Sequence, residues 1–142
     1  MPSFIRRLIF AMLLLGFYAP QINAGTPAPD GVKLYIISPM NGEQGSGPVT
    51  VRFGLRGMGV APAGVEREKT GHHHLLIDVN EMPAMDKPLP SDDNHRHFGG
   101  GQTEVTLDLE KGTHTLQLVL GDKDHIPFDP PIVSDKITIM VK

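Results

Sequence analysis

The clearest structural pattern in the chain is residues 103–120, TEVTLDLEKGTHTLQLVL. Apolar side chains occupy every second position on both sides of Lys111-Gly112, which is a turn sequence. Because a strand points successive side chains to opposite faces, the pattern predicts two strands, each with one buried face. The apolar positions are Val105, Leu107, Leu109, Leu116, Leu118 and Leu120.

The same period of two recurs in other short segments, and nothing after residue 24 shows a helical period. These segments are 32–36, 49–55, 73–79 and 137–141. Short strands separated by turn residues predict an all-β fold, a single immunoglobulin-like β-sandwich over residues 32–142. The Cys and Trp residues of antibody domains are absent, so the prediction concerns the sandwich architecture alone. We expect one core to contain Val51, Phe53, Leu75, Ile77, Val105, Leu107, Leu116, Leu118, Ile137 and Ile139.

Composition narrows the possible functions. The chain has 142 residues, which suits one domain, and it has no Cys. Disulfides, thiolate zinc sites, iron–sulfur clusters and a thiol nucleophile are thereby excluded. The formal net charge of −3 argues against a nucleic-acid partner, because no basic excess is present to neutralise phosphates.

The first 24 residues have the pattern of a secretory signal peptide. Arg6 and Arg7 precede the apolar stretch 8–17, and Ile22-Asn23-Ala24 resembles a cleavage site. The apolar stretch is shorter than the roughly 20 residues that a membrane-spanning helix needs, although an uncleaved anchor remains the alternative. We therefore expect a periplasmic or secreted protein without a stable membrane span. Its mature chain would begin with a flexible leader at residues 25–31.

Two histidines at the start of one predicted strand form the first candidate metal site. His72 and His74 share a face, and their Cα atoms lie about 6.6 Å apart in an extended chain. That spacing lets two imidazoles converge on one ion. His73 points to the opposite face with Leu75 and Ile77, where a core histidine bonded to the backbone is expected.

A second pair, His95 and His97, repeats this spacing at the end of the long connection 80–101. Long loops on a rigid sandwich commonly carry function. If the hairpin between the two loops closes, the second pair can approach the first, although the sequence does not determine whether the two pairs converge. His125, in a loop after the last Leu-rich strand, could complete the site or cap a turn. Neutral imidazole binds both copper and zinc, and the alternative is a hydrogen-bonded polar network.

Two methionines in the same connection bear on the choice of metal. Met82 and Met85 offer thioether sulfur, which favours copper in its reduced state, so copper is predicted and zinc is second. Both residues also suit the filling of gaps over an apolar surface. His114 begins a predicted strand, and a structural role is expected for it.

Several motifs together resemble an uncharacterised family of small exported bacterial proteins, classed as a domain of unknown function. The motifs are GHHHLLID at 71–78, NHRHFGGGQTE at 94–104, HTLQL at 114–118, Gly-Asp at 121–122 and His-Ile-Pro at 125–127. The resemblance extends over about residues 38–141. It implies an exported single domain and no particular activity.

Three functions therefore compete. The first is an exported metal-binding protein that carries or sequesters copper. The second is a binding or structural module of the cell envelope that uses no metal and contacts another envelope protein. The third is an enzyme. Serine hydrolysis is disfavoured because no serine has a nucleophile-elbow context, whereas a histidine-ligated metal enzyme stays open because a free coordination position is invisible in sequence.

Overall fold

The computed structural model describes residues 25–142, and the predicted signal peptide lies outside the described residues. Within this range the chain forms strands and no helix, so the all-β prediction is confirmed. Accordingly, no helix among residues 25–142 is long and apolar enough to cross a membrane. The strands are β1 (Lys33–Ser38), β2 (Gln44–Gly45), β3 (Val49–Arg56), β4 (Gly59–Val60), β5 (Thr70–Ile77), β6 (His95–His97), β7 (Glu104–Leu107), β8 (Gly112–Gly121) and β9 (Ile137–Val141).

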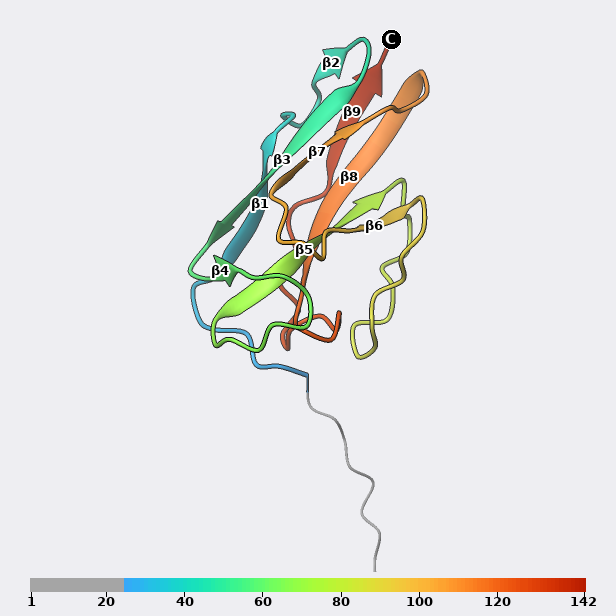
Figure 1. The fold of residues 1–142 in the computed structure, drawn as a ribbon. Coiled ribbons are helices and arrows are strands. Elements are labelled where there is room, and N and C mark those ends of the chain that lie inside the picture. The colour runs from blue at the N-terminus through green and yellow to red at the C-terminus, as the bar shows by residue number, and fades with distance from the viewer. Residues whose placement is uncertain (1–24) are drawn as a thin grey trace, which may run out of the picture.

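The strands form two sheets that pack as a sandwich (Figure 1). The smaller sheet has the order β1-β3-β7, and the larger has the order β2-β9-β8-β5-β4. Strand β6 adds to the larger sheet by antiparallel pairing with β5. Strand β5 is therefore paired on both sides, with β8 on one side and with β4 and β6 on the other.

The core lies between the sheets and contains the residues that the alternation predicted. Leu75, Leu116 and Leu118 are fully buried there, and Val105 packs against the core while partly buried. The rest of the predicted set is also buried in this one cluster. Burying apolar side chains is the main favourable contribution to such a fold, at about 25 cal/mol per Å² of apolar surface.

The outer face of the larger sheet is also partly covered. In the β5–β8 register, His72 is opposite Gly121, His74 is opposite Val119, and Leu76 is opposite Gln117. Leu76 and Val119 form a second small hydrophobic cluster with Leu89, from the connection between β5 and β6, and Met85 packs against it. This connection follows β5 at the yellow-green edge of the molecule in Figure 1. It shields the sheet face on which His72 and His74 lie.

Residues 25–31, expected to be a flexible leader, are held against the domain by hydrogen bonds. Pro27 forms a bridge with Asp129, and the Ala28 amide donates to the Asp129 carbonyl at 2.8 Å. The Thr26 hydroxyl donates to the Asp122 carboxylate at 2.7 Å. The leader thus contacts the loop that follows β8, a pairing that its Pro- and Gly-rich sequence does not reveal.

Candidate metal centre

Strand β5 supplies two of the four histidines that come together on the outer face of the larger sheet. Alternation along the strand puts His72 and His74 on one side, and both are 1% exposed. Their Nε2 atoms are 3.0 Å apart. The predicted convergence of this pair is therefore present in the structure.

Strand β6 supplies the third histidine. Antiparallel pairing with β5 places His97 opposite His74, and His97 Nε2 lies 3.2 Å from His72 Nε2. The ring of His97 lies against Gly99, where an added Cβ would be 2.3 Å from its Cε1 atom. Glycine at position 99 therefore leaves the space that the third imidazole occupies.

The loop after β8 supplies the fourth histidine, and Asp122 organises that loop. The buried Asp122 carboxylate accepts hydrogen bonds from the backbone amides of Asp124 and Ile126. His125 adopts a positive φ of 66°, an uncommon conformation for a residue other than glycine, and its Nδ1 lies 3.2 Å from His72 Nε2. The His125 carbonyl accepts the amide of Leu89, which joins this loop to the connection between β5 and β6.

The other long connection also fixes the site. The Ala63 amide donates to the Gly99 carbonyl at 2.8 Å, and the Gly64 amide donates to the Lys123 carbonyl at 2.9 Å. Residues 63 and 64 thereby join the end of β6 to the His125 loop. Both long connections thus hold parts of the site in place, as loops on a sandwich frequently do.

The four potential ligand atoms of His72, His74, His97 and His125 all lie within 4.8 Å of one another. His72 Nε2 is at the centre, with three other ring nitrogens at 3.0, 3.2 and 3.2 Å. A single imidazole nitrogen either donates one hydrogen or offers one lone pair, so hydrogen bonds cannot satisfy all three contacts. An ion bound at about 2.0–2.1 Å from each nitrogen separates neighbouring nitrogens by about 3–3.4 Å, which matches the three separations from His72 Nε2.

Burial keeps the strand histidines in the form that binds metals. Burial, assisted by the neighbouring His97 and His125, lowers the pKa of His72 to about 4. Burial and the surrounding imidazoles lower the pKa of His74 to about 3. The pKa of His97 is lowered for the same reasons, with burial the larger cause. At neutral pH these rings are neutral and can coordinate an ion without first losing a proton.

His95 was predicted as a ligand, but the structure places it elsewhere. The register puts His95 opposite Leu76, two residues further along β5 than His74. Its Nδ1 lies 2.8 Å from the Asp92 carboxylate, and it is not part of the four-histidine group. The physical reason is the register of β6 on β5, which places His97 beside His74 and moves His95 along β5 away from His72.

The two predicted methionine ligands lie in the connection between β5 and β6. Met82 is 40% exposed, and Met85 packs against the small cluster of Leu76, Leu89 and Val119. The packing of Met85 corresponds to the alternative that these side chains fill a gap over an apolar surface.

The remaining two histidines serve the fold. His73 is fully buried on the core side with its ring 5.1 Å from that of Phe53, as expected, yet neither ring nitrogen has a hydrogen-bond partner. Burial lowers the pKa of His73 to about 4. His114 bonds the Asp78 carboxylate and the Glu110 carbonyl, at 2.7 and 2.8 Å. The hydrogen bond to Asp78 is the main cause of its raised pKa.

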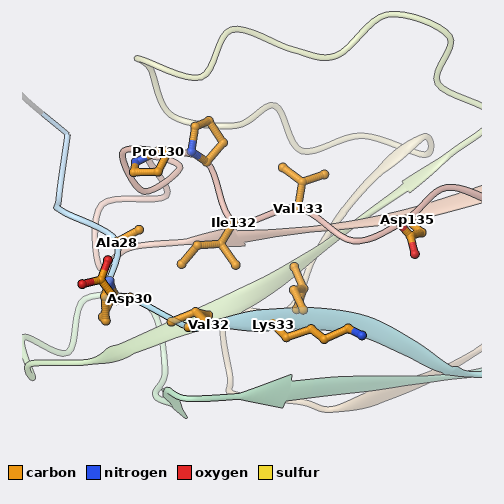
Figure 2. A pocket seen from close by; sticks show the side chains of 12 residues that line it. Ala28, Asp30, Val32, Lys33, Pro130, Ile132, Val133 and Asp135 are labelled. Atoms are coloured by element: carbon orange, nitrogen blue, oxygen red, sulfur yellow. The ribbon is translucent and has the colours of Figure 1, made fainter.

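A separate cavity of about 380 Å³ lies between the leader and residues 130–135 (Figure 2). Its lining is mostly aliphatic side chains and prolines, and its charged residues do not converge on one point. Asp30 and Asp135, for example, lie at opposite ends of it in Figure 2. The four-histidine centre is therefore the better candidate for a functional site, because four metal-binding side chains come together there.

Three residues at the centre were not predicted from sequence as parts of it: Gly99, Gly121 and Asp122. A Cβ at position 121 would lie 2.9 Å from His74 Nε2, so Gly121 gives that imidazole its space. For Asp122, the sequence Asp122-Lys123-Asp124 is a signature of a turn in which a side-chain carboxylate bonds the amide two residues later. The two glycines have no such local signature, because the imidazoles they accommodate come from other strands.

Comparison with known proteins gives one match. No curated protein and no solved structure matches the chain significantly. Residues 51–142, which contain all four histidines of the centre, match the family described as Domain of unknown function (DUF4399). Because the match extends over more than half of the sequence, the chain belongs to the DUF4399 family.

Proposed function

We propose that this chain is an exported protein that binds one transition-metal ion through His72, His74, His97 and His125 and carries or sequesters it. The observation that carries the proposal is the set of three nitrogens within 3.2 Å of His72 Nε2. A hydrogen-bonded network of neutral rings cannot satisfy that arrangement, whereas one ion can. The alternative of an envelope module without a metal leaves these contacts unexplained.

Copper is the proposed ion, with zinc second. Four imidazole nitrogens suit both, but a given nitrogen site generally binds divalent copper more tightly than zinc. The proposal for copper therefore rests on the donor set, and it does not need the two methionines.

Export is proposed from the N-terminal sequence. Arg6 and Arg7, the apolar stretch and the Ala24 cleavage site together support a protein that is exported to the periplasm or beyond. N-terminal sequencing of the exported fraction should find Gly25 as the first residue. Recovery of the chain from membranes with Met1 intact would contradict export and leave the metal site unaffected.

Isothermal titration of Cu(II) and Zn(II) into the chain that begins at Gly25 tests the metal site. We expect one ion per chain, and we expect His97→Ala to weaken binding strongly. His95→Ala is the matched control, because it removes an imidazole from the same short strand without touching the centre. Equal binding by the wild type and His97→Ala would exclude the proposed centre and favour the envelope module.

A further inference from the structure

The distances from His72 to the other three imidazoles also bear on how the ring nitrogens would surround an ion. With each nitrogen about 2.05 Å from an ion, a tetrahedral arrangement separates every pair of nitrogens by about 3.4 Å. The separations from His72 Nε2 are 3.0, 3.2 and 3.2 Å. At that bond length they correspond to angles at the ion of about 94° and 103°, which are smaller than the tetrahedral angle.

The whole set of four nitrogens, however, lies only within 4.8 Å of one another, which is wider than the 3.4 Å of a closed tetrahedron. Because the three separations from His72 are all short, the wider separations are those among His74, His97 and His125. The donor set is therefore most open on the side away from His72. In this arrangement the position opposite His72 has no histidine in it. No carboxylate of residues 25–142 belongs to the ligand group. Asp122, which is buried at the start of the His125 loop, uses its oxygens on Thr26, Asp124 and Ile126.

The surroundings leave this position accessible. His72 is 1% exposed and lies against the sheet, whereas His97 is exposed and His125 is half-buried. Beside His74 and His97 the chain has Gly121 and Gly99, so no side chain extends from these positions over the two Nε2 atoms. Neither glycine has a positive φ, so backbone conformation does not require glycine there. What glycine provides at both positions is space next to the ligand atoms.

We infer that an ion in this centre keeps a fifth coordination position, opposite His72, that takes an exchangeable water molecule or a small anion. The inference rests on the proposed metal site and adds to it a binding function for small ligands. An exchangeable position is typical of metal sites that react with ligands from solution, whereas purely structural sites are closed.

Azide is a suitable probe, because its binding to Cu(II) gives an intense absorption band. Cu(II) is added to the chain that begins at Gly25, excess metal is removed, and the copper content is measured before azide is titrated. We expect a band that saturates at one azide per copper, with the copper retained after azide is removed. The same titration of His97→Ala is expected to give a different spectrum, because its azide complex has one imidazole fewer.

The outcomes are distinguishable. Copper uptake without an azide response shows a closed four-coordinate site and overturns this inference alone. Identical azide spectra for the wild type and His97→Ala show that azide displaces His97, which also overturns it. Failure to take up copper or zinc overturns the proposed function and, with it, the fifth position. His95→Ala should behave as the wild type throughout.

Discussion

The histidines that lie near the two ends of strand β5 have pKa values shifted in opposite directions. At one end, His72 and His74 are surrounded by other imidazoles, and burial lowers the pKa of both. At the other end, His114 faces Asp78, the residue that follows the strand, and its pKa is raised mainly by the hydrogen bond between them.

The difference shows that the partners of a histidine decide its role. His114 directs both ring nitrogens at oxygens that only accept hydrogen bonds, so its charged form is favoured and it has no free lone pair. The imidazoles of the centre face one another, where charging any of them would repel the rest. Their lone pairs therefore remain available for an ion, and this availability separates a ligand from a structural ion pair.

The largest expected effect is on metal affinity. His72→Gln removes the nitrogen at the middle of the centre and should weaken copper and zinc binding by more than about 100-fold, the upper limit for loss of an outer partner of a metal ligand. His114→Gln removes the imidazole that faces Asp78 at the other end of β5, and it should leave the metal affinity unchanged. Titration calorimetry on both variants measures the contrast. A comparable loss of metal affinity in His114→Gln would mean that the His114–Asp78 pair also affects metal binding.

The second prediction concerns acid stability without metal. Unfolded histidines take up protons near pH 6.5, whereas His72, His73 and His74 stay neutral in the folded protein to about pH 4 or below. Their contribution to stability is present above pH 6.5 and is lost as the pH falls toward 4. One group shifted to a pKa of about 4 accounts for on the order of 3 kcal/mol of that loss. The loss is not additive over three interacting rings.

Urea unfolding of metal-free protein at pH 7.5, 6.0 and 5.0 measures this effect. The His114→Gln variant is a useful companion, because it lacks the one histidine whose raised pKa acts in the opposite direction. A free energy of unfolding that stays constant or rises on acidification would show that the buried histidines are protonated in the folded state.

A third prediction uses His73, which lies on β5 between the two ligands. Both of its ring nitrogens are buried without partners, at an expected cost of about 1–3 kcal/mol. His73→Leu should therefore raise the free energy of unfolding by about 1 kcal/mol or more and leave metal affinity unchanged. His73→Ala should lower stability by about 2 kcal/mol or more, because it leaves a cavity in the core. Destabilisation by Leu would indicate that the ring has a partner in solution, such as an ordered water.

The smallest effect is expected at Asp78. Asp78→Asn retains an oxygen for the Thr115 amide and tolerates the positive φ at this position, while it removes the charge that faces His114. With Asp78 39% exposed, the loss should be about 0.5–1 kcal/mol at pH 5.5. The raised pKa of His114 means that this contribution is full below pH 6.5 and disappears as the pH rises through the folded value. Thermal unfolding at pH 5.5 and 9 should show a difference between wild type and variant only at the lower pH.

Much of the fold was predictable because its information is local. Alternation in 103–120 predicted two strands and the side of each that is buried, and the observed β7 and β8 have that arrangement. The same local rule correctly placed His72 and His74 together and His73 in the core. The leader was different, because its hydrogen bonds to Asp122 and Asp129 depend on residues about 100 positions away.

The sequence by itself determined the strand pattern, the shared face of His72 and His74, and a donor set without thiolates. These follow from covalent geometry and from composition, which no partner segment can change. Tertiary structure alone decided which further histidines join them. The register of β6 on β5 brings His97 rather than His95 beside His72, and the Asp122 turn brings His125 to the same point. Strand register and loop closure are fixed by contacts between distant segments, so no local sequence pattern contains them.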